Sequence, residues 1–106
     1  MINIEKVKLH IVEKLKPLNP DKIILFGSYA YGTPNKDSDI DLFIMKDIQK
    51  EEIRSYKLKI RREIRDLISK YHVGFDILVA PESFVQSRED YFYQVDILQN
   101  GKVLYE

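Results

Sequence analysis

Two aspartates at the start of an apolar run constrain this chain more than any other feature. The run is Ile40–Met45, and the carboxylates belong to Asp39 and Asp41. Successive side chains of a strand point to opposite faces, so Asp39 and Asp41 project from one face. The intervening Ile40 and the following Leu42 turn toward a core. Buried strands normally avoid carboxylates, because burying a charged group costs free energy. The presence of this pair therefore indicates a function.

A third aspartate lies inside another apolar run, Val73–Ala80, where Asp76 alternates with apolar neighbours. If this strand lies beside the first, the carboxylates of Asp39, Asp41 and Asp76 converge on one face. Clustered anions repel one another, and some would take up a proton without a compensating cation. Mg²⁺ is the usual cation for such oxygen ligands, and a two-ion site suits transfer of a phosphoryl group.

A Gly-Ser pair follows a third apolar run, Lys22–Phe26, which predicts a buried strand. Gly27 permits a tight turn and a close backbone approach to a ligand, and Ser28 adds a hydroxyl group. If a short helix begins at Ser28, its N–H groups would cradle an anion. The pattern therefore predicts a polyphosphate site that faces the carboxylates.

The remaining chain predicts helices around these three strands. Apolar residues recur at steps of three and four in two long segments, which run from Ile4 to Leu18 and from about Gln49 to Tyr71. In the second segment we place five residues on the buried side: Ile53, Ile60, Ile64, Leu67 and Ile68.

The C-terminal part predicts a last helix and a short closing strand. Residues 87–90 resemble a capping box, with Asp90 in place of Glu. Tyr91, Val95 and Leu98 would carry the helix to Asn100-Gly101, and Lys102–Tyr105 would form the strand. The fold class is α+β, with a small mixed sheet, helices packed on it, and the order α-β-β-α-β-α.

Composition limits the remaining possibilities. The 106 residues suit a single domain spanning 1–106, and 17 basic residues balance 17 acidic ones. No global positive field draws nucleic acid, so direct nucleic-acid binding is not expected. The chain has no cysteine, signal peptide or membrane-spanning run, which fits a cytoplasmic protein. Zero net charge leaves a homo-oligomer open.

The motifs together resemble a known family. Gly27-Ser28, ten residues, the Asp39-Ile40-Asp41 triplet and a later strand with a single Asp resemble the DNA polymerase β-type nucleotidyltransferase superfamily. The similarity is greatest to its minimal nucleotidyltransferase branch, and it covers nearly the whole chain. The resemblance implies a nucleotidyltransferase, polymerase β-like fold and transfer of a nucleoside monophosphate from ATP to an acceptor hydroxyl.

The resemblance also implies roles for particular residues. Gly27 and Ser28 would hold the nucleoside triphosphate, and Asp39, Asp41 and Asp76 would be the catalytic, metal-binding carboxylates for two Mg²⁺ ions. Many minimal members are encoded beside a HEPN-domain toxin and act as its antitoxin, some by attaching AMP to a toxin tyrosine. We therefore expect a HEPN-domain partner.

One position departs from the family pattern. Many relatives carry a basic residue where this chain has Tyr31, and a tyrosine cannot neutralise phosphate charge. Lys36 in the same loop is a candidate substitute, and Tyr29 is a candidate for stacking on the base. Both belong to the predicted nucleotide-binding set.

Two alternatives to this antitoxin enzyme stay open: a non-catalytic subunit that neutralises a partner by contact, and a subunit that modifies a small molecule such as an aminoglycoside.

The segment from Lys46 to His72 carries nine Lys and Arg residues against five Asp and Glu. It could face RNA or an acidic partner, although a solvated helix face explains it more simply. His10 and His72 lack metal-ligand spacing, and we interpret both as structural or surface residues.

Overall fold

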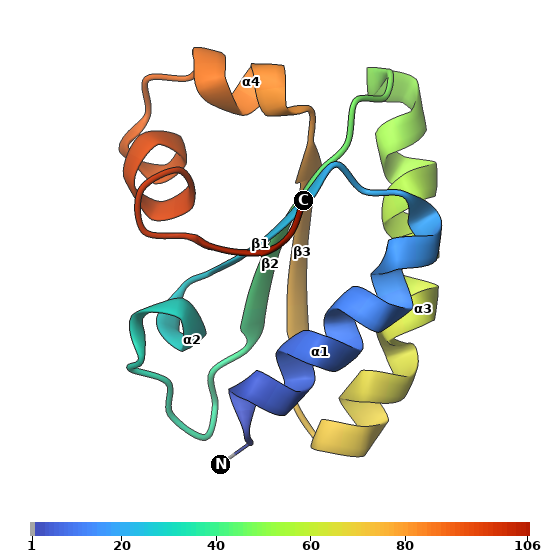
Figure 1. The fold of residues 1–106 in the computed structure, drawn as a ribbon, viewed down its shortest axis with the longest axis vertical. Helices are drawn as coiled ribbons and strands as arrows, with labels where there is room; N and C mark the ends of the chain where they lie inside the picture. Colours follow the sequence, from blue (N-terminus) through green and yellow to red (C-terminus); the bar gives the residue numbers. More distant parts are fainter. Residues whose placement is uncertain (1) are drawn as a thin grey trace.

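The computed structural model describes residues 2–106, and Figure 1 shows one sheet with helices on both of its faces. In chain order the elements are α1 (Ile4–Leu15), η1 (Lys16–Leu18), β1 (Lys22–Phe26), α2 (Ser28–Tyr31), β2 (Ile40–Met45), α3 (Lys50–Tyr71), β3 (Phe75–Ala80), α4 (Glu82–Ser87), η2 (Phe92–Ile97) and β4 (Lys102–Tyr105). The predicted α+β class is confirmed, and both the short helix at Ser28 and the closing strand are present.

The sheet has four strands in the order β3-β2-β1-β4. Strand β1 is antiparallel to β2 and β4, whereas β2 and β3 are parallel. A parallel pair needs a crossover connection, which α3 supplies. The N-terminal ends of β2 and β3 therefore meet at the same end of the sheet, and both aspartate-bearing segments lie there.

Each face of the sheet has its own core. Helices α1 and α3 cover one face, and α4 and η2 lie on the other (Figure 1). The larger core cluster includes Ile11, Leu42 and Ile60. The smaller one includes Phe26, which packs edge-on against Phe92 with ring centroids 5.5 Å apart. Because β1 and β2 are buried on both faces, their sequences are continuous apolar runs.

Side chains fix the starts of the two long helices. The Asn3 side chain accepts hydrogen bonds from two N–H groups in the first turn of α1, and Gln49 forms a capping box with Glu52 at the start of α3. Helix α1 ends before Pro17 and continues as the 3-10 turn η1. Both predicted long helices are confirmed, and none of the helices in residues 2–106 is long and apolar enough to span a bilayer.

One residue of α3 lies on a different side from the one predicted. The buried residues are Tyr56, Ile60, Ile64 and Leu67, whereas Ile68 is 42% exposed. An α-helix turns about 100° per residue, so Ile68 is rotated roughly 80° away from Ile60. The prediction that Ile68 faces the core is therefore wrong.

The segment after β3 also differs from the prediction. Ser87 ends the short helix α4, and its hydroxyl donates to the carbonyl of Phe84 instead of capping a later helix. The last helix is the π-helix η2, whose wider turn leaves Tyr91 and Leu98 exposed. The predicted capping box is wrong because Arg88 and Asp90 pair with each other. Tertiary packing of Phe92 and Ile97 on the sheet takes the place of local capping.

Two isoleucines of α3 give a matched test of this packing. Ile60 is fully buried between α3 and the sheet, while Ile68 is largely exposed on the same helix. We expect Ile60→Ala to lower the free energy of unfolding by about 2–5 kcal/mol, because it leaves a cavity. Ile68→Ala should change it by less than about 1 kcal/mol. Urea unfolding followed by circular dichroism measures both, and equal losses would contradict this placement of α3.

Candidate active site

The register of the sheet brings two of the predicted carboxylates together. In the parallel pair of β2 and β3, Asp41 lies directly opposite Asp76. The same register continues to the residues before each strand, which places Asp39 opposite Gly74. Asp39, Asp41 and Asp76 therefore point to one face of the sheet, as their spacing predicted.

Gly27 makes room for the Asp41 side chain. It follows β1 with φ of 75°, and a Cβ atom at this position would lie 2.1 Å from Oδ2 of Asp41. No side chain fits at that distance, and the positive φ also favours glycine. The glycine of the Gly-Ser pair therefore lets the backbone approach the carboxylate in the next strand.

Gly74 does the same for Asp39. A Cβ atom on Gly74 would lie 2.5 Å from Oδ1 of Asp39. The sequence analysis missed this residue, although a glycine two positions before Asp76 in an apolar run was an available signal. Gly27 after β1 thus makes space for Asp41 in β2, and Gly74 before β3 makes space for Asp39 just before β2.

The electrostatics of the site centre on Asp41. Burial raises the pKa of its carboxyl from 3.8 to about 6, and the nearby charges of Asp76 and Asp39 add to the shift. Asp39 and Asp76 are themselves exposed. The carboxylate that is least accessible to water is therefore the one most in need of a compensating cation.

The donor set fits a divalent cation, because carboxylate oxygens are the ligands that Mg²⁺ prefers. The predicted convergence is nevertheless partial. In the part of the chain that the structure describes, no three His, Cys, Asp or Glu side chains already surround a common metal position. Asp39 and Asp76 are both exposed to solvent. Their side chains would turn toward Asp41 to complete the coordination shell of a bound ion.

The predicted nucleotide-binding residues lie in two different environments. Ser28 begins α2, where the N–H groups of Ala30 and Tyr31 donate to the carbonyl of Gly27. Tyr29 is only 8% exposed and packs in the larger core cluster. This packing anchors α2 to the core, and the hypothesis that the ring stacks on a base stays a prediction.

Lys36 is exposed in the loop between α2 and β2. It lines a hollow of about 370 Å³ together with Tyr29, His72 and Val73. Since Val73 immediately precedes Gly74, this hollow opens at the end of the sheet that carries the aspartates. Among the described residues that line it, Lys36 is the one lysine or arginine.

Tyr31 occupies the position where many relatives carry a basic residue. Its hydroxyl donates to Oδ1 of Asp96 at 2.9 Å, which ties α2 to η2. Partial burial, with the Asp96 hydrogen bond and charge, raises the pKa of Tyr31. The sequence analysis missed Asp96 because it lies 65 residues away in an irregular helix. Tyr31 therefore positions the turn after Gly27 without adding positive charge.

The two histidines have structural roles, as predicted. The Tyr71 hydroxyl lies 2.5 Å from Nδ1 of His10, which links α3 to α1. His72 adopts a left-handed conformation and ends α3. Neither belongs to the carboxylate site.

Comparisons with known proteins give sequence matches over most of the chain. A family model described as a nucleotidyltransferase domain matches residues 4–104. A Methanocaldococcus jannaschii protein named "Putative protein adenylyltransferase MJ0604" is 33% identical over 84 residues, which are 79% of this chain and 77% of that protein. A second protein of that organism, of the same name but numbered MJ0141, is 34% identical over 83 residues, covering 71% of this chain and 78% of the relative.

Solved structures share the fold. A crystal structure of a toxin-antitoxin with AMP-PNP matches with a TM-score of 0.60 and 22% identity, covering 92% of this chain and 72% of that chain. A toxin-antitoxin structure named MntA-HpeT matches with a TM-score of 0.58 and 19% identity, covering 98% and 73%. At these identities the likeness shows the fold alone. The family model, by contrast, spans nearly the whole sequence, and the chain belongs to the nucleotidyltransferase domain family.

Proposed function

We propose that this nucleotidyltransferase transfers AMP from ATP to a hydroxyl group of a protein partner, with release of pyrophosphate, and so acts as the antitoxin of a toxin-antitoxin pair. The observation that carries the proposal is the pairing of Asp41 with Asp76, together with the space that Gly27 leaves for Asp41. A carboxylate pair next to a close backbone approach suits a metal-bound triphosphate.

Each site residue has a role in this proposal. Gly27 and Ser28 bind the triphosphate through the backbone and the hydroxyl, and Lys36 adds positive charge from the loop. Asp39, Asp41 and Asp76 would hold two Mg²⁺ ions, and Asp76 would also orient the attacking hydroxyl. The bound metal would supply charge stabilisation of the transferred phosphoryl group. The chain itself contributes positioning and a partly dehydrated site.

The partner assignment rests on the relatives. Two of them carry the name protein adenylyltransferase, and the structural neighbours are toxin-antitoxin complexes, one of them with AMP-PNP. We propose a HEPN-type toxin as the partner, encoded beside this chain and present with it in the cytoplasm. The acceptor hydroxyl would lie on that toxin.

A non-catalytic binding subunit is the second candidate, and one observation favours it. Tyr31 donates a hydrogen bond to Asp96. Many relatives carry a basic residue at this position, which could bind a phosphate group. In that case the chain would neutralise its partner by contact alone. An Asp39→Asn/Asp41→Asn double variant that still neutralises the partner would support this candidate over the enzyme.

Single carboxylate variants test the proposed enzyme directly. Asp39→Asn and Asp41→Asn should each lower AMP transfer at least about 100-fold, because they remove charge stabilisation worth several kcal/mol. The assay is incorporation of labelled AMP from ATP with Mg²⁺ and the protein of the neighbouring reading frame. Asp37→Asn, in the same exposed loop, is the matched control and should leave transfer unchanged. Equal transfer by all three variants would reject the assignment.

The raised pKa of Asp41 predicts a pH-dependent stability. Its folded pKa of about 6 lies above the ordinary 3.8, so the folded protein binds the proton more tightly than the unfolded chain does. The resulting stability is fully present below about pH 4 and is lost as the pH rises through about 6. We expect about 1 kcal/mol, a figure discounted for solvent screening of a partly exposed group.

Asp41→Asn should therefore be more stable than the parent protein at pH 7.5, and this advantage should shrink toward pH 4. Mg²⁺ should raise the melting temperature of the parent at pH 7.5 and have little effect on this variant. Thermal unfolding across pH, with and without Mg²⁺, measures both effects. A variant as pH-dependent as the parent between pH 4 and 7 would contradict the assigned cause.

Glycine variants separate backbone strain from crowding at the site. Gly27 and Gly32 both have positive φ, but a Cβ atom on Gly32 would meet nothing within 4 Å. Both alanine variants should lose stability from strain, and Gly27→Ala should lose more, because Gly27 has a ψ of −161° in a region that is essentially restricted to glycine, whereas Gly32 is in the αL region. Only Gly27→Ala should displace Asp41, and it should lower kcat/KM for ATP at least about 100-fold. Steady-state kinetics at a temperature where both variants are folded measures this, and equal activity of the two would contradict the role of Gly27.

A further inference from the structure

Strand β3 leaves one of its two edges unpaired. It is the last strand of the sheet, so in residues 2–106 it has a strand neighbour only in β2. The carbonyls of Gly74 and Ala80 accept hydrogen bonds from the segment of β2. Because backbone groups alternate along a strand, those of Ile77 and Val79 point to the outer edge. Such an edge is a template for another strand.

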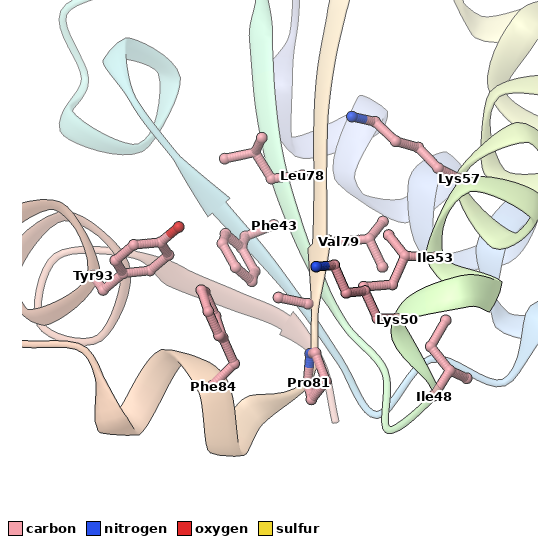
Figure 2. Close-up of a pocket in the computed structure, with 11 residues that line it drawn as sticks. Phe43, Ile48, Lys50, Ile53, Lys57, Leu78, Val79, Pro81, Phe84 and Tyr93 are labelled. Atoms are coloured by element: carbon pink, nitrogen blue, oxygen red, sulfur yellow. The ribbon is translucent and has the colours of Figure 1, made fainter.

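An apolar hollow of about 520 Å³ lies along this edge. Figure 2 shows its lining on both sides of β3: Phe43, Leu78, Phe84 and Tyr93 on one side, and Ile48, Ile53 and Val79 on the other. Phe84 is 41% exposed, although it packs edge-on against Tyr93 with centroids 5.6 Å apart. A strand added to β3 would place its alternate side chains against these two walls.

A row of cations runs beside the same edge. The basic stripe consists of five residues of α3 at steps of three and four: Lys50, Arg54, Lys57, Arg61 and Arg65. Lys50 and Lys57 line the hollow and extend toward β3 in Figure 2. None of the ion pairs found among the described residues uses a member of the stripe. With a rise of 1.5 Å per residue, the stripe is roughly 22 Å long.

The acidic residues of α3 lie elsewhere on the helix. At about 100° per residue, Glu52, Glu63 and Asp66 lie on the opposite side from the stripe, and Glu51 is rotated roughly 80° from its centre. The stripe is instead accompanied by apolar groups, since Leu58 and Ile68 are 49% and 42% exposed. A chain with zero net charge thus presents a local surface that is both cationic and apolar.

We propose that the β3 edge, the hollow and the basic stripe form a docking site for an extended, acidic segment of the protein partner. The segment adds a strand to β3, places apolar side chains in the hollow and sets carboxylates against the stripe. This chemistry favours a polypeptide over nucleic acid, because phosphates match the cations but nothing in a nucleic-acid backbone fills an apolar hollow beside an open strand edge.

The docking site and the carboxylates share one strand. Asp76 is near the start of β3, and the hollow lies from Leu78 onward, so roughly 7 Å separates Asp76 from the nearest hollow residue along the strand. A segment bound to this edge is therefore held beside the carboxylate that orients the acceptor. The inference rests on the proposed function only in taking the docked partner to be the AMP acceptor.

Binding is tested without nucleotide, so that this proposal and the proposed function fail separately. The probe is a short fluorescein-labelled peptide that alternates glutamate with valine and leucine, and anisotropy gives its Kd. We expect binding that weakens with salt. Arg54→Glu/Arg61→Glu should weaken it at least about tenfold. Lys59→Glu/Arg62→Glu makes the same change in net charge at positions rotated about 100° or more from the centre of the stripe, and it should have little effect.

Two further measurements separate this docking mode from simple charge attraction. Phe84→Ser should weaken the alternating peptide several-fold, because it opens one wall of the hollow. Amide hydrogen exchange at Ile77 and Val79 should slow in the complex. An oligoglutamate peptide or an oligouridine that binds as tightly, with the same response to both double variants, would overturn the proposal. So would a bound peptide that leaves the Ile77 and Val79 amides unprotected.

Discussion

Repulsion among neighbouring carboxylates is the constraint on which the rest of this structure depends. Asp41 lies opposite Asp76 across a parallel strand pair, and the sheet holds both regardless of their charge. Burial raises the pKa of Asp41, and the sheet that buries it is held by the apolar clusters on its two faces. The free energy for holding this arrangement therefore comes from the apolar clusters and not from the site itself.

Strand β2 shows how one segment serves both purposes. Its residues Leu42 and Ile44 pack under α1 and α3, while Phe43 and Met45 pack under α4 and η2. Asp41 shares its face with the second pair. On this single face the strand changes from polar to apolar along its length. The end of the aromatic cluster is therefore the boundary of the candidate site. Any change in the packing of η2 would be felt at Asp41 through this shared face.

Much of this arrangement could be predicted from the sequence because local patterns determine it. Apolar runs predict the positions of β1 and β2, and the periodicity of apolar residues predicts that of α3. The spacing of Asp39 and Asp41 predicts that both side chains lie on one face of the sheet. The burial of Tyr29 and the hydrogen bond from Tyr31 to Asp96 could not be predicted, because each depends on a contact between distant segments. The π-helix escaped prediction for the same reason: its wider turn follows from packing on the sheet rather than from local propensity.

The two edges of the sheet lie at different distances from the aspartates, and topology explains why. Strand β4 ends the sheet on one side and pairs with β1, far from the aspartates in strand order. Strand β3 ends it on the other side and carries Asp76 beside its unpaired edge. A polypeptide acceptor bound at β4 would have to reach across three strands, whereas one bound at β3 lies alongside the carboxylates. The parallel crossover through α3 places both the third aspartate and the basic stripe at that edge, so a single topological feature supplies the chemistry and its access.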